Sequence, residues 1–287
     1  MGAKGEPLLR RIVADVLGEE AAGRVWKRIE VIGDIAVIRK PFDMPVDVFR
    51  PVAEELLKRV SYVKSVWLSV SPVEGSYRLR DLVHLAGERR TETIYREHGC
   101  AFRLDITRVY ISLRLSYEHL RVAKLVNDGE RILNMYAGAG FFSIHAACRH
   151  SLEAAYSIDI NPDAYRYMVY NARLNNVDDV VVPILGEAYS TTMRLFRRSV
   201  DRVLMPLPEK ALEHLPAAVA ALEKRGWIHV YLHVKAGRPR EAIERAKSMV
   251  LGRLSAMTTS TVIEETRVVR SVGPREYQVV VDARVTV

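Results

Sequence analysis

The chain has 287 residues, of which 49% are hydrophobic and 27% are charged. This is enough apolar material for one large core or two modest ones. Neither a signal peptide nor an apolar segment long enough to cross a membrane is visible, which excludes a membrane-spanning protein and favours a cytoplasmic one. The formal net charge of +8 and the pI near 9.5 suit a polyanionic partner, although proteins from hot environments are also rich in Lys, Arg and Glu.

The two cysteines, Cys100 and Cys148, are far apart in the sequence and lie among apolar neighbours. We expect two buried free thiols, because so few cysteines at this separation make neither a zinc site nor a disulfide framework. No other metal site is expected.

The first part of the chain, residues 1–105, alternates strand patterns with little helix. This pattern predicts a small N-terminal α+β domain. The expected elements, in order, are a polar tail and a helix within 1–20, two strands within 26–38, a helix at 45–60, a strand at 63–70, a loop at 71–76, short strands within 77–95 and a strand at 100–105.

The second part, residues 106–287, alternates strands with helices, and this alternation predicts a doubly wound α/β sheet. Two strands at the end of the chain are expected to form an antiparallel pair. The expected strands are 131–136, 154–158, 180–185, 201–205, 226–234, 262–269 and 277–285, and the expected helices are 118–125, 141–148, 162–175, 209–224 and 239–251.

The stretch from Arg131 to Asp159 is typical of a nucleoside-binding βαβ unit. A buried strand leads into a turn that contains Gly138 and Gly140, and a helix and a second strand follow. Glycines let the backbone approach a ligand, and Asp159 at the second strand end can accept both ribose hydroxyls. A third glycine at dinucleotide spacing is missing, which argues against NAD and for S-adenosylmethionine, a cofactor without a pyrophosphate. A purely structural glycine turn is the alternative.

Two further strand ends have residues that suit a ligand, because ligands of open α/β sheets lie beyond the carboxyl ends of the strands. Glu187 could accept the adenine amino group or simply be solvated. Pro206-Leu207-Pro208 lacks two backbone donors. We expect the carbonyl groups before the prolines to be free to face a substrate; a strand-ending turn is the alternative.

Before the glycine stretch, Tyr110 could pack on adenine or on the protein core. Glu118 opens a helix, where a carboxylate is favourable without any function. Basic groups recur at Arg194, Arg197, Arg198 and Arg202. Most such groups are solvated, and some could contact phosphates.

Taken together, these segments resemble the archaeal and eukaryotic tRNA methyltransferases that modify N1 of the guanosine at position 37, beside the anticodon. That family shares its fold with the wybutosine-pathway aminocarboxypropyl transferases. No single segment is specific, but their joint order is. The matching segments are WKRIEVIGDIAVI (26–38), LVHLAGERRTETIYR (82–96), VYISLRLSYEHLRVAKL (109–125), LNMYAGAGFFSI (133–144), DINP (159–162), DRVLMPLP (201–208) and SVGPREYQVVVD (271–282).

The resemblance implies a Rossmann-like class I methyltransferase sheet, S-adenosylmethionine as cofactor and the tRNA anticodon stem-loop as partner, with the N-terminal domain on the tRNA side. We expect a monomer. It implies that Glu118 is the general base that removes the N1 proton and that Arg78 stabilises charge on the guanine O6. Pro206 and Pro208 would flank the loop that holds the target base. The implied cofactor contacts are Tyr110, Tyr136, Gly138, Gly140, Asp159 and Glu187.

The chain departs from the family pattern in three ways. Pro206 replaces an asparagine that could contact the target base, and Asn134 replaces the usual acid at the end of the first strand of the sheet. The chain is also expected to lack the separate N-terminal domain with which many members grip the tRNA body. These departures leave two alternatives open: an enzyme that methylates the tricyclic wyosine precursor at the same position, and a tRNA-binding relative without catalytic activity. Aminocarboxypropyl transfer is a third alternative, but the segment Met205-Pro206-Leu207-Pro208 is closer to the methyltransferase pattern.

Overall fold

The computed structural model describes residues 6–41 and 43–287, and the chain divides into two compact units. The N-terminal unit contains Met1–Glu97 and Ala101–Leu113, and the C-terminal unit contains His98–Cys100 and Arg114–Val287. The boundary expected after residue 105 therefore falls inside the N-terminal unit. The polar tail expected at the start of the chain lies, for residues 1–5, outside the described residues.

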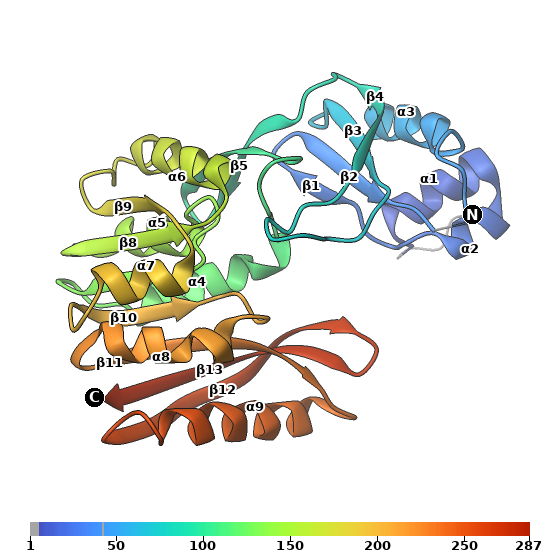
Figure 1. Ribbon diagram of the computed structural model, residues 1–287. Helices are drawn as coiled ribbons and strands as arrows, with labels where there is room; N and C mark the ends of the chain where they lie inside the picture. Colours follow the sequence, from blue (N-terminus) through green and yellow to red (C-terminus); the bar gives the residue numbers. More distant parts are fainter. Residues whose placement is uncertain (1–5, 42) are drawn as a thin grey trace. The chain divides into compact units, whose positions relative to one another are not determined.

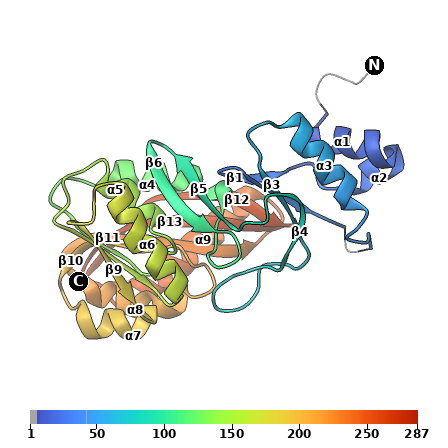
Figure 2. The ribbon, with the colours of Figure 1, turned by 90° about the horizontal axis from the view of Figure 1, so that it is seen from above.

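The N-terminal unit is built on a four-stranded sheet of order β1-β2-β3-β4, with helices α1, α2 and α3 gathered on one side (Figure 2). Apolar residues of α1, including Leu9, Ile12 and Val13, share one buried core with Phe49 and Leu56 of α3. The elements of this part of the chain are α1 (Leu8–Leu17), α2 (Glu19–Arg24), β1 (Glu30–Ile32), β2 (Ile35–Arg39), α3 (Phe49–Arg59), β3 (Ser65–Ser69), β4 (Leu82–Gly87), and a two-stranded sheet of β5 (Glu92–Glu97) and β6 (Cys100–Asp105).

The turn between β1 and β2 requires glycine. Gly33 has φ of 59°, and a Cβ at this position would lie 2.6 Å from the carbonyl oxygen of Ile94. The two strands expected around Gly33 are confirmed. Helix α2 was not expected, because this helix is too short to show an apolar period.

The C-terminal unit is built on a seven-stranded sheet of order β12-β13-β11-β10-β7-β8-β9 (Figure 1). Strands β9, β8, β7, β10 and β11 are parallel, and β13 and β12 continue the sheet antiparallel, as expected. The elements are a 3₁₀ helix (Leu113–Leu115), α4 (Ser116–Leu125), β7 (Arg131–Asn134), α5 (Phe141–Ala147), β8 (Ala154–Asp159), α6 (Pro162–Leu174), β9 (Val181–Leu185), α7 (Ala188–Leu195), β10 (Val200–Met205), α8 (Ala211–Ala221), β11 (Leu222–Lys235), α9 (Pro239–Leu254), β12 (Ser260–Gly273) and β13 (Glu276–Thr286).

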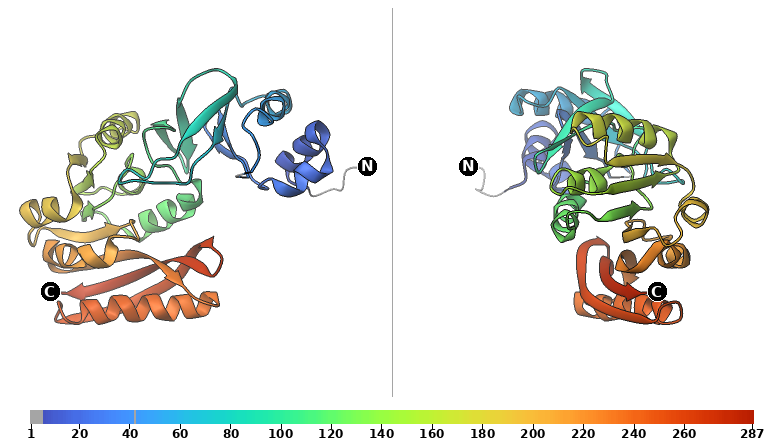
Figure 3. Two further views of the ribbon diagram at one scale, coloured as in Figure 1. Left: turned by 45° about the vertical axis from the view of Figure 1, so that its right-hand side comes forward. Right: turned by 90° about the vertical axis from the view of Figure 1, so that its left-hand side faces the viewer.

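Helices cover both faces of this sheet, with α4 and α5 on one face and α7 and α8 on the other (Figure 3). The central strands are buried on both sides, which explains their continuous apolar runs. Two helical predictions were incomplete. Helix α7 was not expected, and α8 ends at Ala221 rather than Lys224, because Leu222 already pairs with Val200 in the parallel ladder.

None of the helices within residues 6–41 and 43–287 is long and apolar enough to cross a membrane. Cys100 and Cys148 are both free thiols, as expected. The expectation of burial is confirmed for Cys100 and wrong for Cys148, which is exposed.

Candidate active site

The carboxyl ends of four parallel strands form one row of residues. In the register of the sheet, Asn134 pairs with Ser157 and with Leu204, which in turn pairs with His229. The residues two positions further along each strand are therefore level with one another. These are Asp159, Tyr136, Pro206 and Tyr231, in the order β8, β7, β10 and β11.

The turn after β7 holds the residues that the sequence singled out for a cofactor. Gly138 and Gly140 both have positive φ, 56° and 94°. A Cβ on Gly140 would lie 2.9 Å from Ile144 Cδ1, so this glycine is needed for close packing onto α5. A Cβ on Gly138 would meet no heavy atom within 4 Å. The turn therefore leaves open space beside Gly138 at the carboxyl edge of the sheet.

Asp159 borders this space. One carboxylate oxygen accepts a hydrogen bond of 2.7 Å from the Gly138 backbone N–H, and the other accepts one of 2.9 Å from Asn161 N–H. Burial raises the pKa of Asp159, while these backbone donors oppose the rise. An ionised carboxylate offers about four acceptor positions, so capacity remains for further hydroxyl donors. The structure thus brings Gly138 and Asp159 together, as the sequence predicted.

Glu187 follows β9 and caps α7. Its carboxylate accepts hydrogen bonds of 2.8 Å from the N–H groups of Tyr189 and Ser190. Desolvation opposes ionisation, but these bonds and nearby His214 hold the pKa of Glu187 below its usual value. Glu187 therefore has a structural role as a helix cap. The Glu187 side chain remains 44% exposed, so its role as a cap does not bury it.

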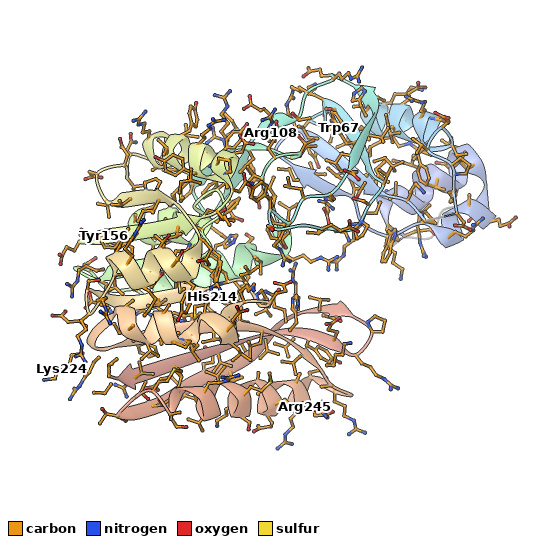
Figure 4. The ribbon with its side chains drawn as sticks, in the orientation of Figure 1. Trp67, Arg108, Tyr156, His214, Lys224 and Arg245 are labelled. Carbon is orange, nitrogen blue, oxygen red and sulfur yellow. The ribbon has the colours of Figure 1, made fainter. Side chains whose placement is uncertain are left out.

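Tyr136, the next predicted cofactor contact, is paired with a residue that the sequence did not reveal. The Tyr136 hydroxyl lies 2.7 Å from Nδ1 of His214 on α8, which is labelled in Figure 4. Burial lowers the pKa of His214 against the opposing charge of Glu187. The ring is therefore neutral at pH 7, and its Nδ1 accepts a hydrogen bond from the Tyr136 hydroxyl. His214 Nδ1 also lies 3.8 Å from Glu187 Oε1, so α8 joins the residues after β7 and β9 into one cluster.

The Pro206-Leu207-Pro208 segment directly follows β10 and is half-buried. The expectation that both carbonyls before the prolines stay free is wrong for Leu207. Its oxygen accepts hydrogen bonds of 3.1 Å from the backbone N–H groups of Lys210 and Ala211, which begin α8. The segment is therefore a strand-to-helix turn as well as a candidate substrate loop.

Glu118 lies in the first turn of α4, and only 1% of it is exposed. Its Oε2 accepts hydrogen bonds from the Tyr231 hydroxyl at 2.8 Å and from Arg121 Nη2 at 3.1 Å, and its Oε1 forms an ion pair with Arg267. A buried carboxylate is costly unless it is paired and hydrogen-bonded. Strands β11 and β12, distant in the sequence, supply the partners Tyr231 and Arg267. Through Tyr231, Glu118 is connected to the row of strand ends.

A chain of buried polar groups continues from Arg121 beneath α4. Arg121 also pairs with Asp282, whose Oδ1 lies 2.6 Å from His229 Nδ1. His229 Nε2 lies 2.7 Å from Arg202, which pairs with Glu130 at 2.6 Å. Complete burial lowers the pKa of His229, so the neutral ring donates to Asp282 and accepts from Arg202. Desolvation raises the pKa of Asp282, but His229 and Arg121 outweigh this effect and hold the pKa well below its usual value.

This network corrects one expectation about the basic residues. Arg202 is only 1% exposed and is fixed by Glu130, so it is not available to a phosphate. Arg194, Arg197 and Arg198 are exposed around the end of α7. Among residues 6–41 and 43–287, no ion pair is recorded for these three.

The remaining predicted residues belong to the N-terminal unit. Arg78 has φ of 56°, and its guanidinium lies 4.9 Å from the centre of the Tyr110 ring. The contact explains how both side chains are held locally. Of the neighbouring arginines, Arg80 pairs with Glu30 and Arg90 pairs with Asp34 and Glu88. Arg89 is exposed.

The same unit has a surface hollow of about 920 Å³. Its lining includes the cations Arg90, Arg96 and Arg103 and the aromatic rings of Tyr62 and Tyr95. Arg96 is exposed, whereas Arg90 and Arg103 are paired with acids. Cations interleaved with aromatic rings suit a nucleic-acid strand.

Comparison with known proteins agrees with this geometry. The TRM5/TYW2 methyltransferase domain matches residues 93–253, and the TYW2 N-terminal domain matches residues 9–91. The tRNA 4-demethylwyosine(37)-methyltransferase Taw21 of Saccharolobus solfataricus is 42% identical over 260 residues, which are 91% of this chain and 94% of Taw21.

Two more relatives have known structures. The tRNA (guanine(37)-N(1))-methyltransferase Trm5b of Pyrococcus abyssi is 35% identical over 90% of this chain and 74% of its own. A crystal structure of Trm5b superposes with a TM-score of 0.84, covering 99% of this chain and 82% of that chain at 31% identity. Methanocaldococcus jannaschii TYW2, solved in complex with AdoMet, superposes with a TM-score of 0.69 at 25% identity, covering 90% of this chain and 99% of that chain.

The expected resemblance and the expected methyltransferase fold are therefore confirmed. The carboxyl-edge row, the open glycine turn and the capped acid after β9 are arranged on the sheet that these relatives share. The chain belongs to the TRM5/TYW2 methyltransferase family.

Proposed function

We propose that this protein is an S-adenosylmethionine-dependent methyltransferase that modifies the base at position 37 of tRNA, with 4-demethylwyosine as the base it accepts. The observation that favours this substrate is the 42% identity with Taw21 across 91% of this chain and 94% of Taw21. The sequence alone favoured N1 methylation of guanosine over methylation of the tricyclic base. The degree of similarity to Taw21 favours the tricyclic base instead.

The open turn beside Gly138 is the proposed cofactor site. When bound there, S-adenosylmethionine supplies the methyl group. Gly138 lets the backbone come close without a side chain, and Asp159 has acceptor capacity for the ribose hydroxyls. Tyr136 and Glu187, linked through His214, would line the adenine side of the same space. Tyr110, which the resemblance also assigns to the cofactor, remains a proposal.

Glu118 is the proposed general base. Its carboxylate would accept the proton that the target base loses as the methyl group arrives, a contribution of about 10²–10⁴-fold in typical enzymes. Tyr231, Arg121 and Arg267 hold this carboxylate in one orientation. They are positioning residues, because they act on the reaction through Glu118. The target base must leave the anticodon-loop stack to reach the row that contains Tyr231 and Pro206.

Guanosine at position 37 is the second candidate substrate, because Trm5b of P. abyssi is 35% identical over 90% of this chain. The N1 atom of guanine carries a proton at neutral pH, so this reaction also needs a base. Arg78 would then stabilise the charge on O6. Pro206, in place of the family's usual asparagine, removes a side-chain amide that could contact the guanine edge, and it therefore favours the tricyclic base over guanosine.

The test offers the full-length protein two matched tRNAs, one with guanosine and one with 4-demethylwyosine at position 37. Both are incubated with S-adenosylmethionine, and the product nucleosides are identified by mass spectrometry. We expect methylation of the tricyclic base, with a higher single-turnover rate than on guanosine. Methylation of guanosine alone would refute the substrate assignment and leave the cofactor assignment intact. Transfer of an aminocarboxypropyl group, or no transfer to either tRNA, would refute the methyltransferase proposal. Glu118→Gln, incubated with the same two tRNAs, should methylate either base more slowly than the wild-type protein.

A further inference from the structure

The row of strand ends continues beyond Tyr231. In the two antiparallel ladders Tyr231 pairs with Val280 of β13, and Val280 pairs with Arg267 of β12. Residues that lie directly opposite each other in such a ladder point to the same face of the sheet. Arg267 is therefore level with Tyr231 and on the same face, and both side chains contact Glu118.

The two oxygens of the Glu118 carboxylate differ in their partners. Oε2 accepts hydrogen bonds from the Tyr231 hydroxyl and from Nε and Nη2 of Arg121. Oε1 is buried and forms an ion pair with Arg267, but within residues 6–41 and 43–287 nothing donates a hydrogen bond to it. Buried polar atoms in proteins are nearly always hydrogen-bonded. Oε1 is thus the acceptor that remains for a donor of the substrate.

Arg267 is the partner of Glu118 that can leave. A general base must come within hydrogen-bond reach of the proton that it removes, yet Glu118 is only 1% exposed. Of its two arginines, Arg121 has a side chain that is 10% exposed and also pairs with Asp282, whereas the Arg267 side chain is 24% exposed. The Arg267 guanidinium lies 5.0 Å from the ring centre of Tyr117, which is 65% exposed. Arg267 therefore has a path toward solvent.

We propose that Arg267 covers Oε1 of Glu118 in the free protein and exchanges this carboxylate for a phosphate of the target nucleotide when tRNA binds. The proposal rests on the proposed function, because it takes Glu118 as the base. An arginine fork fits a phosphate as well as a carboxylate. The N–H of the target base then takes the place of Arg267 at Oε1, while Arg121 stays on Oε2. A buried carboxylate is costly to uncover without such a replacement, so Glu118 becomes accessible only to its substrate.

The first measurement is the affinity of the full-length protein for tRNA across a salt series. Arg267→Ala should lower the slope of log affinity against log salt by about 0.7, the value for one contact to a single strand. Arg267→Lys keeps the charge and should keep the slope. Arg284→Ala is the matched control, because Arg284 belongs to the same pair of strands and pairs with Glu264, but is level with Trp227 rather than with Tyr231. It should leave the slope unchanged.

The second measurement is the pH dependence of methylation, which separates a cover from a permanent partner. The profile of kcat/KM reports on the free enzyme, and the profile of kcat reports on its complex with substrate. In Arg267→Ala the acid limb of kcat/KM should move to higher pH by about one unit, because a carboxylate that has lost a nearby cation ionises less readily. The acid limb of kcat should stay in place. Arg267→Lys should keep both limbs at their wild-type positions.

Three outcomes would overturn the proposal. An equal shift of both limbs would show that Arg267 stays on Glu118 during the reaction, an unmoved kcat/KM limb would show that it does not cover Glu118 in the free protein, and an unchanged salt slope would show that it meets no phosphate. If the wild type methylates neither tRNA, the proposed function fails, and the salt slopes, which need only binding, still decide on the phosphate. If Arg267→Ala melts far below the wild type, Arg267→Gln replaces it in the same assays.

Discussion

The hydroxyl of Tyr231 donates a hydrogen bond of 2.8 Å to Oε2 of Glu118, and each of these residues is only 1% exposed. Tyr231 is level with the end of β10 in the sheet register, whereas Glu118 begins α4. This bond joins the proposed base to the row of strand ends. Burial raises the pKa of Tyr231, so the phenol keeps its proton and remains a donor at neutral pH.

Tyr231→Phe should therefore weaken both stability and activity. The change removes the donor and keeps the ring, so Arg121 and Arg267 still neutralise Glu118. We expect a loss of about 1–2 kcal/mol in the free energy of unfolding and a several-fold lower single-turnover methylation rate at unchanged tRNA affinity. Urea unfolding and rapid-quench assays measure the two effects. An unchanged rate alongside reduced stability would make Tyr231 purely structural.

Glu118→Gln tests the base itself. Glutamine is nearly isosteric but cannot accept the proton, so single-turnover methylation should fall by at least about tenfold while tRNA affinity stays within a few fold. The substitution also leaves two arginines without their shared carboxylate. The melting temperature must therefore be measured beside the rate. A folded variant with the parental rate would return Glu118 to a structural role at the start of α4.

Gly138→Asp tests the cofactor site. The new side chain would enter the open space beside Asp159, where a second carboxylate would occupy the proposed ribose position. We expect S-adenosylmethionine binding, measured by calorimetry, to be lost. Gly129→Asp is the matched control, because Gly129 also has positive φ, 78°, and open space around its Cβ, but lies before β7. It imposes the same backbone strain and should bind normally. Equal affinity in both variants would contradict the assignment.

Binding of tRNA should weaken steeply with salt, because each neutralised phosphate releases counterions. Arg197→Ala and Arg89→Ala change exposed arginines, and each should reduce the slope of log affinity against log salt by about 0.7–0.9 if that residue contacts a phosphate. Arg80→Ala is the control, because Arg80 is paired with Glu30 and has a side chain that is 12% exposed. It should leave the slope unchanged.

Arg78→Ala should behave differently from the other arginine variants and slow the chemical step more than it weakens binding. Binding that does not respond to salt would contradict this view of recognition.

The stability of the C-terminal unit should fall as the pH is lowered below about 6.5, the ordinary pKa of an unfolded histidine. Burial holds the pKa of His229 lower than that in the folded protein. The unfolded chain therefore binds a proton first, and stability that is fully present above about pH 6.5 is lost as the pH falls toward the folded value. The loss is at most about 1.4 kcal/mol per pH unit for this group.

Urea unfolding between about pH 7.5 and about pH 5.5 measures this slope. His229→Gln should reduce it without abolishing it, because burial also lowers the pKa of His214. A slope equal to that of the wild type would show that another group accounts for the acid sensitivity.

The sequence by itself determined the order of the strands in the chain and the strand ends that form the candidate site. The alternation of strands and helices from residue 109 onward predicted the doubly wound sheet and its antiparallel end. The glycine turn and Asp159 were predictable because they depend on local rules: glycine at positive φ, and an acid at the end of the next parallel strand.

Only the tertiary structure decided which side chains surround Glu118, which arginines are buried and which cysteine is exposed. Tyr231 and Arg267 reach Glu118 from strands more than a hundred residues later, and Arg202 is buried against Glu130 rather than exposed. Cys148 is exposed, although its neighbours in the sequence are apolar. Periodicity and turn chemistry are local, whereas these contacts follow from the order and register of strands in the sheet, which no short stretch of sequence specifies.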